Sequence, residues 1–138
     1  MRKLKPIAMI LFCQLTILPA SDLAAQPIAK FIRVIAQSTN TKGVTCSNKE
    51  IARELTNLGV EIVPDSRLVW ADSDKEIPFL ARTGKFVICG TRSGVMAGAV
   101  LGLIAEEGRP AILLNSKALA ATRISLPDNV LKLAKVSL

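Results

Sequence analysis

Two cysteines that end apolar segments are the first residues in this chain whose type and spacing could do chemistry. Cys46 ends the segment 43–46 and Cys89 ends the segment 85–89. Each lies at the carboxyl end of a predicted strand, so the two sulfurs come close if these strands are neighbours. A disulfide between Cys46 and Cys89 would close the long loop between these two residues. Such a bond stabilises a fold by about 2–4 kcal/mol. We therefore predict a Cys46–Cys89 disulfide, which an oxidising compartment would permit.

Catalytic roles for these cysteines, or for the serines, have little support because the chain contains no histidine. A Ser-His-Asp triad is excluded and a Cys/His metal site cannot be completed. Cys46 precedes a predicted helix, whose N-terminus can lower a thiol pKa, so a thiol-active exported protein is one hypothesis. Glu106 and Glu107 fall in a predicted turn, where solvated charge is expected. We predict no catalytic residue, no metal and no cofactor.

The segment Gly90–Gly94, with the sequence GTRSG, is the second candidate site. It follows a predicted strand, and α/β sheets bind ligands at the carboxyl ends of their strands. Free backbone N–H groups in such a glycine loop can bind an anion where a helix begins. The candidate anion-binding residues are Thr91, Arg92, Ser93 and Gly94. Because the loop lacks the P-loop and dinucleotide signatures, an ordinary connecting loop is the favoured interpretation.

Alternating strands and helices surround these sites and predict an α/β fold. Strands are expected at residues 43–46, 60–63 and 85–89, with a further extended piece at 68–70. Capping boxes that begin at Ser47 and Ser73 indicate helices between these strands. The apolar segment 28–37 fits either a helix or a strand. This order predicts a parallel sheet whose strands are joined by helical crossovers.

A hairpin and two helices are expected at the C-terminal end of the chain. The apolar runs 100–105 and 111–114 flank a turn-like acidic tetrapeptide, which is typical of a β-hairpin. Asn115 can cap a helix at 116–121, and a last helix is predicted over 127–135. The predicted fold class is therefore α/β, a Rossmann-like wound mixed sheet with a C-terminal β-hairpin followed by two helices.

The first 25 residues have the layout of a cleavable export signal. Basic residues precede an apolar core at 7–18, and small residues up to Ala25 offer a cleavage site. The core of about 12 residues is shorter than the roughly 20 that a spanning helix needs, although an uncleaved anchor is the alternative. We expect residues 1–25 to be a signal peptide and 26–138 to be a single domain that works in the periplasm.

The charge of the chain argues against nucleic acid as a partner. The formal net charge is +7, but the basic residues are scattered, and the chain has one Trp and no Tyr. Nucleic-acid sites cluster Lys and Arg and often add stacking aromatic side chains. A cationic surface that faces anionic lipid or an acidic partner is the better inference.

The C-terminal third carries the most informative pattern. Residues 98–134 read GAVLGLIAEEGRPAILLNSKALAATRISLPDNVLKLA. This resembles the YfiR family of periplasmic regulators, whose domains end in a Gly-led strand, an acidic-Gly-Arg turn, a strand finishing in Asn, an Ala-rich helix and a closing Leu-Leu-basic-Leu-Ala helix. The residues that match this pattern are Gly108, Arg109, Asn115, Leu131, Leu133 and Ala134. The chain departs from it in having no Trp-Pro after 28–37, and Pro127 and Asp128 where the family favours serines.

The resemblance implies a function by binding and not by catalysis. YfiR-like proteins restrain a membrane-bound diguanylate cyclase through its periplasmic region, and they can form homodimers. In physical terms such a protein biases a two-state partner by contacting one state better than the other. The alternative hypothesis is an exported small-molecule or anion-binding domain that uses the Gly90–Gly94 loop.

Overall fold

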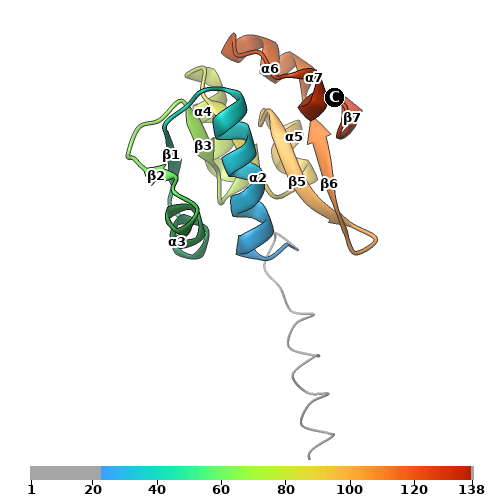
Figure 1. The fold of residues 1–138 in the computed structure, drawn as a ribbon. Helices are drawn as coiled ribbons and strands as arrows, with labels where there is room; N and C mark the ends of the chain where they lie inside the picture. The colour runs from blue at the N-terminus through green and yellow to red at the C-terminus, as the bar shows by residue number, and fades with distance from the viewer. Residues whose placement is uncertain (1–22, 138) are drawn as a thin grey trace, which may run out of the picture.

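The computed structural model of the protein describes residues 23–137, so the basic residues and apolar core of the predicted export signal lie outside it. A seven-stranded sheet has the order β2-β1-β3-β4-β5-β6-β7 (Figure 1). The strands are β1 (Gly43–Cys46), β2 (Glu61–Ile62), β3 (Leu68–Trp70), β4 (Phe86–Cys89), β5 (Leu101–Glu106), β6 (Arg109–Leu114) and β7 (Ala134–Ser137). The helices are α2 (Ala25–Ser38), α3 (Lys49–Asn57), α4 (Ile77–Arg82), α5 (Arg92–Met96), α6 (Ser116–Thr122) and α7 (Asp128–Leu131), with a 3₁₀ turn, η1 (Asp74–Glu76), before α4.

The winding of the sheet reverses direction at β1. From β1 the chain passes to β2 on one side and then to β3 on the other, and both pair with β1 in parallel. Strands β4 and β5 continue outward in parallel from β3, whereas β6 pairs with β5 antiparallel. This arrangement confirms the predicted Rossmann-like wound mixed sheet with a hairpin. Sheets of this kind bind ligands where the strand order reverses, here between β1 and β3.

Helices cover both faces of the sheet and divide the core into two clusters. Figure 1 shows α2 crossing one face of the sheet. Ile28, Ile32 and Ile35 of α2 recur at helical spacing and are buried with Ile51 of α3 against that face. Ile77 of α4 belongs to the cluster on the opposite face, together with side chains of α5. The burial of this apolar stripe explains why the ambiguous segment 28–37 is a helix.

Side chains of polar residues define where several helices begin. Asn48, one residue after the predicted cap Ser47, accepts a hydrogen bond from the Ile51 N–H at the start of α3. Ser73 caps η1 as expected from its capping box. Asn115 accepts a hydrogen bond from the Ala118 N–H and caps α6, which confirms that prediction. Each cap satisfies a backbone donor that the helix itself leaves without a partner.

The C-terminal segment differs from the sequence prediction. Instead of one helix over 127–135, α7 ends at Leu131 and the chain continues as β7, which pairs in parallel with β6. A strand here pairs the backbone groups that β6 would otherwise present at a sheet edge. The hairpin turn itself follows the prediction, because Glu107 and Gly108 both have positive φ, as a two-residue turn requires.

Replacing Asn115 with Ala tests the role of its side chain as a structural link. Its amide also donates to the Val95 carbonyl oxygen at 3.0 Å, so the substitution removes a cap and leaves that acceptor unpaired. We expect Asn115→Ala to lower the free energy of unfolding by about 2 kcal/mol in urea titrations. Asn57→Ala, at the exposed end of α3, is the matched control and should change it by less than about 0.5 kcal/mol. Equal effects of the two substitutions would contradict this role.

Candidate functional site

A cavity of about 370 Å³ opens at the carboxyl ends of β1, β3 and β4. It therefore lies at the reversal of the strand order, where wound sheets bind their ligands. The residues that line it are Leu23, Ala24, Ala25, Ile28, Asn48, Glu50, Ile51, Trp70, Ala71, Asp72, Asp74, Gly90 and Thr91. The segments after the three strands supply Asn48, Asp72, Asp74 and Thr91, and α3 adds Glu50. The apolar lining comes from α2 and the residues before it, from Ile51 of α3, and from Trp70 and Ala71 at the end of β3.

Asp72 joins the two loops that flank the strand reversal. Its Oδ1 accepts a hydrogen bond from Asn48 Nδ2 at 3.1 Å and another from Trp70 Nε1 at 3.2 Å. Asn48 follows β1, whereas Trp70 ends β3 and is buried. These bonds hold the carboxylate at the cavity and leave its charge uncompensated, because both donors are neutral. The sequence analysis missed this group, although a Trp two residues before an Asp at the end of a short strand was visible.

The Gly90–Gly94 loop uses its donors on a carboxylate of the protein itself. Thr91 Oγ1 donates to Asp74 at 2.8 Å, and Ser93 Oγ donates to the other oxygen of the same carboxylate. The Gly94 N–H in turn donates to Thr91 Oγ1 at 2.9 Å. Arg92 forms an ion pair with Glu106, with 3.6 Å between Nη2 and Oε2, and it does not line the cavity. The candidate anion-binding residues are thus organised around an acidic group, an arrangement that repels a bound anion.

The predicted Cys46–Cys89 disulfide is wrong, because both cysteines are free. Strand β3 lies between β1 and β4, so the two cysteines belong to strands about 9.5 Å apart. A disulfide requires Cα atoms within about 7 Å. The pairing of Cys46 with Trp70, and of Trp70 with Ile88, also puts Cys89 one residue further along, where its side chain points to the opposite face.

Burial keeps both thiols protonated. It raises the pKa of Cys46 to about 11, and the nearby Asp72 carboxylate adds to the effect. Burial likewise raises the pKa of Cys89 to about 11, with a contribution from Asp74. Each sulfur donates a hydrogen bond to a backbone oxygen, Cys46 to Asn48 and Cys89 to Thr91. Neither environment activates a nucleophilic thiol, which argues against the thiol-active hypothesis.

An apolar groove lies beside the hairpin, away from the cavity. Its volume is about 260 Å³, and its lining combines α2, the hairpin and the segment after α7. The lining residues are Pro27, Phe31, Leu103, Pro110, Ala111, Ile112 and Leu133. Leu133 keeps 61 % of its surface exposed despite its apolar side chain. The groove is therefore an apolar surface that the described part of the chain leaves open.

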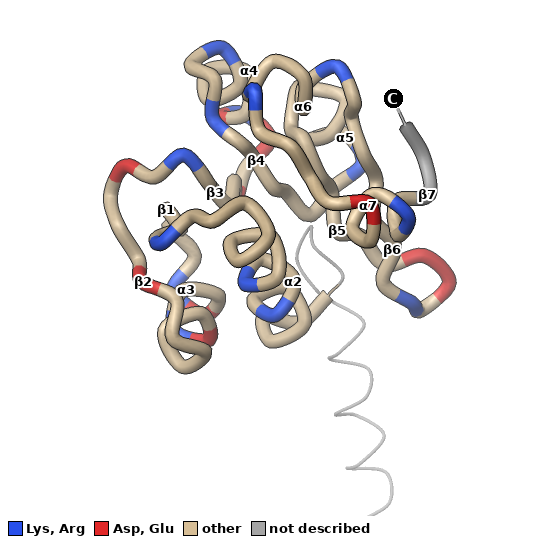
Figure 2. Tube along the Cα trace, turned by 45° about the horizontal axis from the view of Figure 1, so that its top comes forward, with Lys and Arg blue, Asp and Glu red and all other residues tan. Residues whose placement is uncertain are grey.

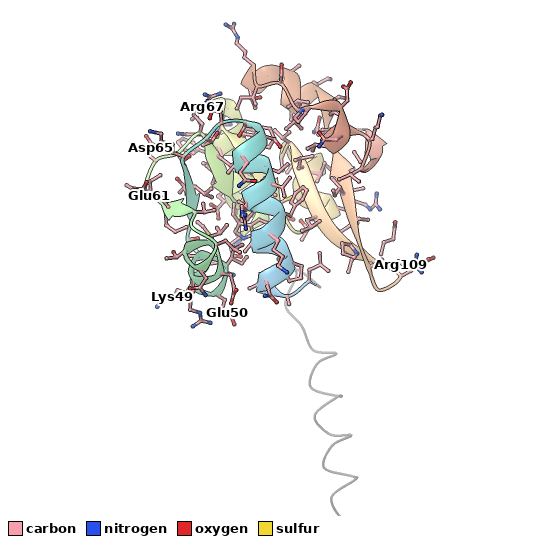
Figure 3. The ribbon with its side chains drawn as sticks, viewed as in Figure 1. Lys49, Glu50, Glu61, Asp65, Arg67 and Arg109 are labelled. Atoms are coloured by element: carbon pink, nitrogen blue, oxygen red, sulfur yellow. The ribbon has the colours of Figure 1, made fainter. Side chains whose placement is uncertain are left out.

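The residues that match the YfiR-type pattern lie around this groove and at the hairpin. Gly108 and Arg109 lie at the hairpin turn, and Figure 3 shows Arg109 at its tip, far from Glu50. Leu133 lines the groove, and Ala134 pairs with the groove residue Ile112. Leu131 packs against the core cluster that contains α2, and Asn115 ends the hairpin at α6. These residues thus lie on β6 and its flanking segments, with Gly108 and Arg109 at one end of the strand and Asn115 at the other, and Leu133 is the one among them that lines the groove.

Two further observations concern residues 23–137. None of their helices is both long enough and apolar enough to cross a bilayer. Within the same residues, His, Cys, Asp and Glu side chains form no group of three or more that could hold a metal ion.

Comparison with known proteins places the fold but no family. No family model and no curated protein matches the chain. A conserved domain protein from Vibrio cholerae matches its structure with a TM-score of 0.63 at 13 % identity, over 82 % of this chain and 60 % of the other. An ABC domain in complex with L-Trp from Streptococcus pneumonia matches with a TM-score of 0.64 at 13 % identity, over 82 % and 62 %. The chain thus spans less than two thirds of either, and the likeness is one of fold.

The raised thiol pKa values predict slow alkylation of the folded protein. At pH 8 a shift from 9.0 to about 11 lowers the thiolate fraction about 100-fold relative to an ordinary cysteine. We expect iodoacetamide to label Cys46 and Cys89 slowly at pH 8, and faster only as the pH rises toward 11. The urea-unfolded chain, whose thiols titrate near 9, is the control and should be labelled about 100-fold faster at the same pH of 8. Fast labelling of the folded protein at pH 8, followed by mass spectrometry, would contradict the assigned environments.

Proposed function

We propose that this protein is a non-catalytic regulatory domain of the YfiR type that acts in the periplasm. Its partner would be a membrane-bound diguanylate cyclase, which it restrains by binding the periplasmic region of that enzyme. One observation carries the proposal. The segment that carries the YfiR-type pattern forms the last strands of the sheet, and its residue Leu133 lines an open apolar groove beside them.

The groove has the character of a surface for a protein partner. Phe31 of α2 and Leu133 after α7 both line it. Val34, one helical turn after Phe31, is 46 % exposed. Contiguous exposed apolar surface on a small domain commonly marks an interaction site. An amphipathic partner segment could place its apolar face there, as helices do in hydrophobic grooves.

Charges around the groove favour a partner of a different kind over a second copy. Lys30, Arg109 and Lys132 each adjoin a lining residue in the sequence. Figure 2 shows Lys and Arg on α2, at α7 and at the hairpin turn, with acidic residues at that turn and on α7. A groove-to-groove homodimer would bring the basic residues of α2 toward their own copies, which costs energy. A partner segment with acidic and apolar residues avoids this repulsion.

Binding of this kind can regulate without chemistry. If the partner exists in an active and an inactive state, a domain that binds the inactive state better shifts the population toward it. Such a role needs no activated nucleophile, and the thiols of Cys46 and Cys89 both have a pKa well above the physiological range. It needs a complementary surface, which the groove would provide.

Substituting Leu133 tests the groove as the partner surface. Leu133→Glu puts a charge into the groove, and we expect about a thirtyfold loss of affinity for the partner, the lower end of the range of an interface hot spot. Deleting the gene in its host should raise cyclic di-GMP, measured by mass spectrometry of cell extracts. Restoring the wild-type chain should reverse the rise, and the Leu133→Glu chain should not.

Met96→Glu is the matched control, because Met96 is 73 % exposed on α5, which packs with the other core cluster. The Met96→Glu chain should lower cyclic di-GMP to the same level as the wild-type chain. Thermal unfolding of both purified variants would establish that each is folded. An unchanged cyclic di-GMP level in the deletion strain would contradict the proposed function. Equal activity of the two variants would contradict the proposed surface.

A further inference from the structure

We propose that the cavity at the carboxyl ends of β1, β3 and β4 binds a small organic cation, an amine carried on an apolar or aromatic body. This inference is independent of the proposed partner. Its first support is topological, because the cavity lies between β1 and β3, where the winding of the sheet reverses. At such a point the loops that follow neighbouring strands diverge and leave a crevice for a ligand. Here a crevice of about 370 Å³ is present, within the size range of small-molecule sites.

The charge of the lining selects the ligand class. Glu50, Asp72 and Asp74 line the cavity, and no Lys or Arg does so among the described residues. Lys49 and Lys75 adjoin these acids in the sequence, but neither lines the cavity. A cleft lined by charges of one sign attracts the opposite charge and repels its own. An anionic ligand would meet carboxylates here, whereas an ammonium group would find acceptors.

Two of the carboxylates are held in position by neutral donors. Asp72 accepts from Asn48 and Trp70, and Asp74 accepts from Thr91 and Ser93. Neither forms an ion pair with a described residue, so their negative charges remain available to a ligand. Because these hydrogen bonds already fix the carboxylates, an ammonium group can bind without first ordering them.

The apolar part of the lining accounts for the body of the ligand. Ile28 of α2 and Ile51 of α3 are buried in the same core cluster as Trp70 of β3, and all three line the cavity. Burying the apolar stem of an amine among them adds the hydrophobic contribution that a small inorganic cation lacks. Residues 23–25 also line the cavity, but the carboxylates and Trp70 all lie later in the chain. Cleavage after Ala25 would therefore leave the elements on which the proposal depends.

The single tryptophan of the chain reports directly on this cavity. Trp70 lines it, and the indole N–H donates to Asp72 at 3.2 Å. A ligand that binds Asp72 should therefore change the emission of Trp70. Two probes of similar size and opposite charge can be titrated, 2-phenylethylamine and 3-phenylpropanoate, with excitation at the red edge where neither probe absorbs. We expect a saturable change with the amine at pH 7 and none with the carboxylate.

Substitutions of the cavity carboxylates test whether the amine binds in this cavity. Asp72→Asn keeps the shape of the side chain but removes its charge, and we expect it to weaken amine binding about fivefold, as expected for a partly exposed ion pair. Glu50→Gln should also weaken amine binding, measured by thermal shift. This variant replaces Asp72→Asn as the test if Asp72→Asn does not fold. Glu61→Gln on β2 is the control, because Glu61 pairs with Gly43 at the amino end of β1 (Figure 3), and it should bind the amine as the wild type does.

Three results would overturn the proposal. One is the absence of any saturable change with 2-phenylethylamine, and another is equal or tighter binding of 3-phenylpropanoate. The third is amine binding that the Asp72 and Glu50 substitutions leave unchanged, which would put the amine at another site. None of these results depends on the cyclic di-GMP measurement, so failure of the pocket and failure of the regulatory proposal are distinguishable.

Discussion

The insertion of β3 between β1 and β4 is the constraint on which the rest of the structure depends. Because β3 lies on the side of β1 opposite to β2, the winding reverses at β1, and the loops after β1 and β3 separate to form the cavity. The same insertion keeps Cys46 and Cys89 too far apart for a disulfide and leaves two protonated thiols, Cys46 half-buried and Cys89 buried. It also brings Trp70 and Asn48 to the same Asp72 oxygen, which ties the two loops together.

The sequence predicted the fold class because its signals were local. Caps at Ser73 and Asn115, the hairpin turn and the alternating elements all follow from neighbouring residues, and each is confirmed. The order of the strands is not local, and the three residues of β3 are too few to carry a strong pattern. The disulfide prediction was wrong because it assumed that β1 and β4 are neighbours, whereas β3 lies between them. The prediction of a helix after Leu131 was wrong for a related reason. The helical pattern there is only a few residues long, and pairing with β6 outweighs it.

Helix α2 connects the two surfaces that the proposals concern. Its Ile28 lines the acidic cavity, whereas Pro27 and Phe31 line the apolar groove. A ligand in the cavity and a partner in the groove would therefore contact the same helix from two sides. Coupling between two sites requires an element that both ligands bias, and α2 is the element that both surfaces share.

The proposed partner surface runs along α2 and the β5–β6 hairpin. Hydrogen exchange of the purified protein, with and without the periplasmic region of the membrane-bound cyclase from its host, tests it most directly. Partner binding at this surface should add protection in residues 25–38 and 101–114, with exchange of α4 and α5 unchanged. No added protection anywhere, or protection confined to α4 and α5, would contradict it.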